Sequence, residues 1–146
     1  MVQLMSDAFS KADNFLKKSD RKSVSALVLA GGWVESLYFS CELNNQKASE
    51  KMLKRIGEQK ETLKTLIDLL SEYNKENKND SLIEELNDLM SSFDKIDLQY
   101  EYEAPEIDEK ERLTTLTHRL NVNVSEKVLE EIRTKITSIR NNIIKA

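Results

Sequence analysis

The spacing of apolar residues constrains this chain more than any other feature of its sequence. These residues recur every three or four positions in five successive segments, which is the period of an α-helix with one buried face. Three glycines and one proline are the only strong helix breakers among 146 residues, so we expect long helices and short loops. We therefore predict a mainly α-helical fold. The predicted helices cover about residues 2–19, 23–43, 49–73, 81–96 and 125–145.

The apolar stripes of these helices are narrow, as in helices that pack side by side in a bundle. In the first helix the stripe is Met5, Ala8, Ala12 and Phe15 or Leu16. In the third it is Met52, Ile56, Leu63, Leu66, Leu70 and Tyr73. In the fourth it is Leu82, Leu86, Leu89, Phe93 and Ile96, and in the last it is Leu129, Ile132, Ile136, Ile139 and Ile143.

Polar residues mark the expected ends of these helices. Asn44 and Asn45 break the pattern of the second helix. Ser81 and Glu84 have the spacing of a capping box, in which each side chain accepts a free backbone N–H of the first turn. Ser125 precedes the last helix and is its expected N-cap.

The apolar period changes to two between the last two predicted helices. Leu98, Tyr100 and Tyr102 alternate with polar residues, and a second alternating run covers residues 116–124. Such alternation is typical of half-buried strands. We predict a small two-stranded antiparallel β-ribbon before the last helix, with residues 104–112 as a mobile connection. The alternative is an irregular acidic loop.

Length, charge and cysteine content exclude several classes of protein. A chain of 146 residues is one domain, so we treat residues 1–146 as a single helical domain. The net charge is −4, and basic residues sit beside acidic ones, which argues against nucleic-acid binding. The single cysteine excludes an intrachain disulfide and a cysteine-rich zinc site. No phosphate-binding loop, nucleophile elbow or zinc-protease motif is present, so we expect no cofactor, no metal and no enzymatic activity.

The most unusual stretch is residues 31–36, which read Gly-Gly-Trp-Val-Glu-Ser. Two glycines inside a helix cost about 1 kcal/mol each relative to alanine, so a compensating role is expected. One interpretation is a kinked helix lining a pocket, with Trp33 and Tyr38 as its walls and Glu35 as its polar group. The other is tight packing of a second helix on a smooth surface.

Glu35, Glu42, Cys41 and His118 carry the side chains that could take part in chemistry. Glu35 and Glu42 lie two helical turns apart on one face, and paired carboxylates can serve acid–base or metal chemistry. An ion pair with Arg55 or Arg133 is the structural interpretation for Glu35. Cys41 lacks a nearby histidine and is expected to be a small buried hydrophobe. The only histidine, His118, lies in the predicted ribbon.

The most apolar run, Val24 to Val34, is about half the length that spans a bilayer as a helix. Basic residues precede it and Cys41 follows it, which is the order of a lipoprotein signal. Trp33 and Glu35 interrupt the run, and Phe39 is bulky where small residues precede the cysteine of such signals. We therefore predict no targeting signal and no transmembrane segment.

Two stretches and the closing helix carry a resemblance to a known family. Residues 26–38, which read ALVLAGGWVESLY, are followed by RIGEQK at 55–60, and residues 132–141 form the closing helix. Together they resemble an uncharacterised family of predicted exported helical proteins from Bacteroidetes, often labelled lipoproteins. The resemblance implies a location in the periplasm or cell envelope and implies no activity. Members of that family are usually longer, so it also implies that this chain is part of a longer exported protein.

These observations favour a non-enzymatic helical module that binds a partner at the bacterial cell envelope. The partner is a protein or a small-molecule ligand, and the predicted contact residues are Trp33, Glu35, Tyr38, Tyr100 and Tyr102. One alternative is a structural bundle that self-associates as a homodimer through its isoleucine and leucine stripes. A second alternative is a small metal-dependent or acid–base enzyme that uses Glu35 and Glu42. The absence of a signal leaves the cytoplasm as the alternative location.

Overall fold

A computed structural model describes residues 10–11, 14, 22–75, 77–102, 106–108, 113–115 and 118–145. The described residues form four helices and four short strands. The helices are α2 (Lys22–Gln46), α3 (Glu50–Tyr73), α4 (Asp80–Phe93) and α5 (Glu126–Lys145). This confirms the mainly helical prediction, with four helices in the described part of the chain where five were expected. The remaining predicted helix, at 2–19, lies outside the described residues except for three helical positions, Ser10, Lys11 and Asn14.

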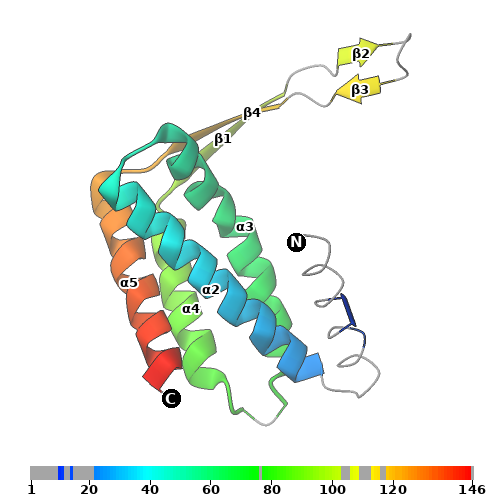
Figure 1. Cartoon of the computed structure of the whole chain (residues 1–146), viewed down its shortest axis with the longest axis vertical. Helices are drawn as coiled ribbons and strands as arrows, with labels where there is room; N and C mark the ends of the chain where they lie inside the picture. The colour runs from blue at the N-terminus through cyan, green and yellow to red at the C-terminus, as the bar shows by residue number, and fades with distance from the viewer. Residues whose placement is uncertain are drawn as a thin grey trace.

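The four helices form a bundle in which α2 and α4 each pack against both α3 and α5. Consecutive helices run in opposite directions (Figure 1). Polar contacts agree with this arrangement for α4 and α5. Lys95, just beyond the end of α4, lies 2.6 Å from Glu131 near the start of α5. Asn142, near the end of α5, donates to Glu85 near the start of α4 at 3.1 Å.

The core consists largely of the predicted apolar stripes. The buried residues of α3 and α4 include Ile56, Leu63, Leu66, Leu70, Leu86, Leu89 and Phe93. In α5 the stripe is shorter than predicted. Ile132, Ile136 and Ile139 are buried, but Ile143 is 42% exposed because it lies in the last turn of α5. From α2 the core receives Ala26, Ala30, Val34, Leu37 and Cys41.

Two asparagines organise the connections at the ends of α2 and α3. The side-chain oxygen of Asn44 accepts the backbone N–H of Ser49 at 3.2 Å, and that of Asn74 accepts the N–H of Asn79 at 3.0 Å. Asn44 is buried inside α2, which continues to Gln46. The predicted break at Asn44 is therefore wrong, because this side chain satisfies a backbone group of the following turn instead of ending its own helix.

The expected caps have different outcomes. Ser125 caps α5 as predicted, since its hydroxyl accepts the N–H of Val128 at 3.3 Å. The capping box at Ser81 is wrong, because α4 begins one residue earlier, at Asp80, with Asn79 at the N-cap position.

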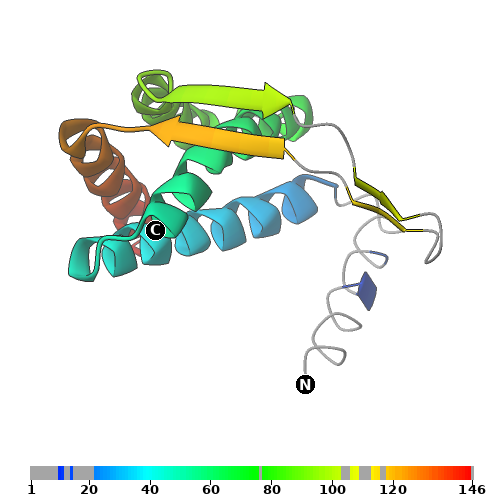
Figure 2. The same cartoon turned by 90° about the horizontal axis from the view of Figure 1, so that it is seen from above.

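The β-ribbon is present where the alternating pattern predicts it. Strand β1 (Asp97–Tyr102) pairs antiparallel with β4 (His118–Asn123), and Figure 2 shows the two side by side. The short strands β2 (Glu106–Asp108) and β3 (Leu113–Thr115) also pair antiparallel. Residues 106–108 are thus part of a strand and not only a connection, because Ile107 stands opposite Thr114 in a second ladder. Figure 1 shows this second pair projecting away from the helices.

Gly57 of α3 allows the ribbon to approach the bundle closely. Leu98 of β1 stands opposite Val122 of β4, and both pack against the core. A Cβ atom on Gly57 would lie 2.6 Å from Cγ1 of Val122 and 3.4 Å from Cδ2 of Leu98. Valine is short and stiff at χ1, so its methyl group has little room to move aside. Gly57, the isolated glycine of the sequence, is therefore the position at which the side chains of the ribbon pack closely against α3.

We expect Gly57→Ala to destabilise the protein by about 1–3 kcal/mol, because overpacking at Val122 outweighs the better helix propensity of alanine. Gly31→Ala is the matched control. A Cβ there meets nothing within 4 Å, so this variant should gain up to about 1 kcal/mol from propensity alone. Urea unfolding monitored by circular dichroism measures both. Equal stabilisation by the two substitutions would contradict the close packing of Val122 against Gly57.

Candidate functional site

Two of the predicted contact residues, Glu35 and Tyr38, share one partner on α5. Arg140 donates from Nε to one carboxylate oxygen of Glu35 at 2.7 Å and from Nη2 to the other at 2.9 Å. Its guanidinium carbon also lies 4.5 Å from the centre of the Tyr38 ring. The expected partner of Glu35 was Arg55 or Arg133. Arg140 takes this place because α5 runs antiparallel to α2, which brings its end beside the middle of α2.

The second carboxylate of the pair, Glu42, also contacts an arginine of α5. Arg133 lies 3.5 Å from Glu42 and makes a two-pronged contact with Glu130 at 2.8 and 2.9 Å. The hydrogen bonds from Arg140 hold the pKa of the Glu35 carboxyl below its ordinary value. Glu35 and Glu42 therefore link α2 to α5 through separate ion pairs.

Within the described residues, no three His, Cys, Asp or Glu side chains gather as metal ligands would.

Trp33 lies on the opposite edge of α2. Its indole N–H donates to the side-chain oxygen of Gln59 on α3 at 3.0 Å, and its ring is half-buried. Trp33 and Tyr38 consequently do not face each other across a pocket. α2 continues as a single helix through both glycines, and the predicted kink stays a prediction.

The predicted contact residues of the ribbon lie in β1. Tyr100 and Tyr102 stand opposite Leu120 and His118 in the register with β4. The side chains of these four residues lie outside the described part of the structure, so the prediction that the two tyrosines contact a partner stays a prediction.

Cys41 is buried in the core of the bundle. Burial, together with the neighbouring charge of Glu42, raises the pKa of its thiol to about 12, although Arg133 acts in the opposite direction. A thiol that stays protonated is a poor nucleophile and a poor metal ligand. The interpretation of Cys41 as a small hydrophobe agrees with this position.

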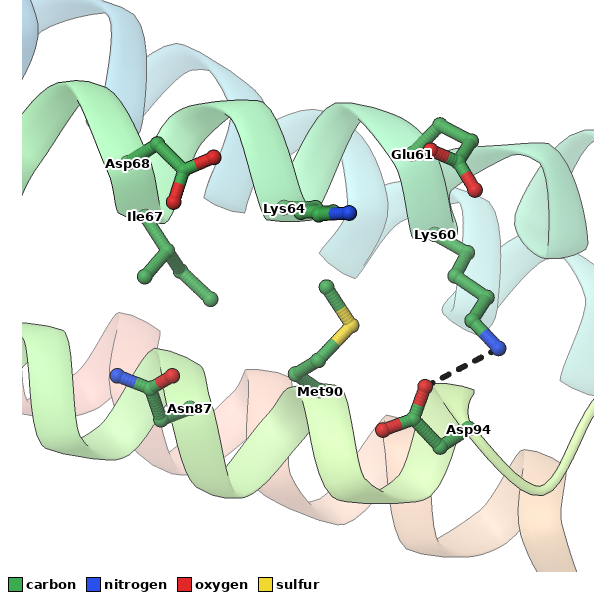
Figure 3. A pocket seen from close by; sticks show the side chains of 8 residues that line it. All are labelled: Lys60, Glu61, Lys64, Ile67, Asp68, Asn87, Met90 and Asp94. Carbon is green, nitrogen blue, oxygen red and sulfur yellow. Dashed lines mark ion pairs between the residues drawn. The ribbon is translucent and has the colours of Figure 1, made fainter.

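Two hollows among the described residues are lined by side chains other than Trp33, Glu35 and Tyr38. One, of about 460 Å³, lies where α2, α3 and α5 meet near Cys41, Asn44 and Arg133. Another, of about 350 Å³, lies between α3 and α4. Figure 3 shows Ile67 and Met90 directed into it, with Lys60 and Asp94 joined at one end at 3.1 Å. Its remaining lining side chains are charged or amide groups that suit a solvated groove.

The most distinctive surface is the side of α2 that faces away from the bundle. Most helices of a bundle carry polar residues on this side, but here it is largely apolar. Val24, Val28, Leu29, Phe39 and Leu43 are 41%, 54%, 58%, 54% and 53% exposed. Gly32 and Ser36 are exposed between them. We call these seven residues the α2 outer face.

Gly32 lies at the middle of the α2 outer face, and a Cβ added to it would meet nothing within 4 Å. The same is true of Gly31. Neither glycine therefore serves tight packing between the described helices, which corrects our second interpretation of residues 31–36. The space above Gly32 is open, and large apolar side chains surround it.

Sequence reasoning missed the α2 outer face because it treated residues 24–34 as a single apolar run. A helical projection of residues 24–43 shows the signal. Ala26, Ala30 and Leu37 fall on one side, whereas Val28, Gly32 and Phe39 fall on the other. α2 thus has two apolar sides, of which the bundle covers one.

The apolar character of α2 also bears on membrane spans. By length and composition α2, with 25 residues, is apolar enough to cross a bilayer. Our prediction of no transmembrane segment considered only residues 24–34, which are too short. In the structure α2 is a bundle helix with six buried residues that face its neighbours.

Comparison with known proteins adds no assignment to this geometry. No family model, curated protein or solved structure matches the chain. The similarity to predicted exported proteins therefore stays a prediction.

The ion pair of Glu35 predicts a pH-dependent stability. Its carboxyl pKa is lowered in the folded state, so the pair stabilises the fold above the ordinary value of 4.5, and this contribution is lost as the pH falls through the lowered pKa. We expect Glu35→Gln to be less stable than the wild type at pH 7, with the difference shrinking toward pH 3. Thermal unfolding at the two pH values measures it, with Glu61→Gln on exposed α3 surface as control. If the difference in stability does not change with pH, the stabilisation by the contact between Glu35 and Arg140 does not depend on the charge of Glu35.

The burial of Cys41 predicts slow reaction with thiol reagents. A pKa of about 12, against an ordinary value of 9.0, reduces the thiolate fraction about a thousandfold near neutral pH. Native protein treated with a chromogenic disulfide reagent at pH 8 should therefore react at least about a hundredfold more slowly than protein unfolded in guanidinium. Equal rates would place Cys41 at the surface.

Proposed function

We propose that this chain is a non-enzymatic interaction module that binds an amphipathic helix of a partner protein on the α2 outer face. The observation that carries the proposal is a row of large, exposed apolar side chains along one helix, with an open glycine at its centre. Contiguous apolar surface of this kind is characteristic of interaction sites. A partner helix that presents apolar residues at intervals of three and four would bury this row.

The composition of the α2 outer face resembles that of a protein interface. Phe39 is its largest side chain, and the Tyr38 ring lies 5.6 Å away. Aromatic residues at the centre of an interface often carry most of the binding free energy. The ion pairs of Glu35 with Arg140 and of Glu42 with Arg133 border one edge of the face. An apolar centre beside a polar rim is the usual organisation of such interfaces.

A protein helix suits the α2 outer face better than a lipid surface does. Helices that lie on membranes carry Lys and Arg along their polar edges, where they meet anionic headgroups. On α2 the charged groups beside the face are Glu35 and Glu42, each already paired with an arginine, and a single lysine, Lys22, in the first turn. The open space above Gly32 also fits a small side chain of an approaching helix, as in close helix–helix contacts.

The proposal extends to location only through the family resemblance. Residues 26–38 and 55–60 carry the similarity to exported proteins, and they include part of the α2 outer face. On that basis we place the interaction at the bacterial cell envelope. Fractionation of native cells tests this part separately from the interaction itself.

Self-association is the second candidate, because the same face and the exposed Ile144 of α5 offer apolar surface to another copy. A sedimentation measurement at high protein concentration distinguishes the two. A monomer favours a separate partner, and a stable dimer favours self-association.

Photo-crosslinking in native cells tests the interaction. The crosslinking amino acid p-benzoylphenylalanine replaces Phe39 in one protein and Leu113 in another, since both side chains are exposed, at 54% and 58%. We expect a discrete protein adduct at position 39 and not at position 113. Mass spectrometry of the adduct should identify a partner segment with apolar residues at helical spacing. Adding Leu43→Glu should weaken the adduct at least about tenfold, the effect of losing about 1.4 kcal/mol of binding.

Three outcomes would contradict the proposal. Equal adducts at both positions would mean that the α2 outer face has no partner. Adducts with lipid alone would identify a membrane surface instead. Adducts with a second copy of the chain would favour self-association.

A further inference from the structure

We infer that the hollow where α2, α3 and α5 meet binds a small, uncharged and largely apolar molecule that carries a carbonyl oxygen. This site is separate from the α2 outer face and does not depend on the proposed function. Three features of the hollow support the inference: its apolar wall, an unused hydrogen-bond donor on the buried Asn44, and the charges around it.

The wall of the hollow is largely apolar. The hollow lies at the end of the bundle where the connection between α2 and α3 meets the start of α5 (Figure 1). Its volume of about 460 Å³ falls within the range of about 300–1,000 Å³ that is usual for small-molecule sites. The apolar lining residues are Cys41, Leu53, Val124 and Leu129. The last three are only half-buried, so an apolar molecule in the hollow would bury more of their surface.

Asn44 gives the hollow a donor that no described residue uses. Its side chain lines the hollow, although the residue is only 4% exposed. The side-chain oxygen accepts the backbone N–H of Ser49 at 3.2 Å, which fixes the orientation of the amide group. The side-chain nitrogen donates to none of the described residues. Because a buried donor without a partner is costly, it favours an occupant that offers an acceptor oxygen.

Arg133 does not compete for the same acceptor. All three of its guanidinium nitrogens contact carboxylates, Nε and Nη2 those of Glu130 and Nη1 that of Glu42. Asn44 is therefore the buried donor that would hold the acceptor of a bound molecule.

The charges of the lining favour an uncharged molecule. The lining contains the carboxylates of Glu126 and Glu130 and the guanidinium of Arg133, so an anion would meet more negative than positive charge. A cation at the buried end would face the donor hydrogens of Asn44. Burial raises the pKa of the Cys41 thiol to about 12, so this group adds no charge near neutral pH.

Two probes of nearly equal shape test the site in the full chain. Acetophenone carries a carbonyl oxygen, and α-methylstyrene carries a methylene group in its place. We expect the wild type to bind acetophenone at least about fivefold more tightly, because the olefin leaves the Asn44 donor without a partner. Two-dimensional proton–nitrogen NMR measures binding, and the signals that shift should include those of Ala48 and Leu129, which line the hollow. Benzoate, an anion of similar size, should bind at least about tenfold more weakly than acetophenone.

A matched pair of variants separates the donor from the added charge. Asn44→Asp replaces the side-chain nitrogen with an acceptor and keeps an oxygen for the N–H of Ser49. Asn45→Asp adds the same charge at an exposed position of the lining. We expect Asn44→Asp to lose the preference for acetophenone over α-methylstyrene and Asn45→Asp to retain it. Circular dichroism establishes that both variants are folded, and the comparison of the two probes in the wild type requires neither variant.

Four results would overturn the inference. Equal affinity of the wild type for acetophenone and α-methylstyrene would mean that the Asn44 donor takes no part in binding. An unchanged preference in Asn44→Asp would mean the same. Shifts confined to the α2 outer face would show that the probes bind only exposed apolar surface. No shift at the solubility limit of acetophenone would show that the hollow holds water only.

Discussion

The burial of apolar stripes from four helices in one core is the constraint on which the rest of this structure depends. Leu63, Leu86, Leu89, Ile132 and Ile136 have essentially no exposed surface, and they come from three different helices. Their contacts set the antiparallel order of the bundle. That order in turn places Arg140 beside Glu35 and Arg133 beside Glu42. The ion pairs follow from the packing and do not direct it, because exposed ion pairs contribute little free energy by themselves.

α2 differs from its neighbours in the way it meets this constraint. It contributes small residues, Ala26 and Ala30, to the core beside Val34 and Leu37, and it keeps larger apolar side chains on the opposite side. In a helix that only served the bundle, that side would carry polar residues. The exposed side chains of α2 therefore require an explanation outside the four-helix core. The proposed partner helix supplies one.

Much of the fold was predictable because helical and strand periods are local properties of a sequence. The stripes of residues 49–73 and 81–96 and the alternation at 97–102 correspond to α3, α4 and β1. The errors concern side chains whose roles depend on distant partners. From the sequence Asn44 was predicted to break the helix, but in the structure its side chain accepts the N–H of Ser49. Gly57 is an isolated glycine in the sequence, and in the structure the side chain of Val122 packs closely against it. The candidate site was predicted less well, since Trp33 and Tyr38 lie on the same helix but at opposite edges.

The sequence by itself determined the helical class, the position of the ribbon and the identity of most core residues, because each depends on spacing within a single segment. Only the tertiary structure decided which of the two apolar sides of α2 is buried. It also decided which arginine pairs with Glu35, and that Gly31 and Gly32 face open space whereas Gly57 does not. These outcomes depend on how separate helices are placed against one another. That placement depends on the packing of the whole core. It therefore cannot be predicted from the spacing of residues within any one segment.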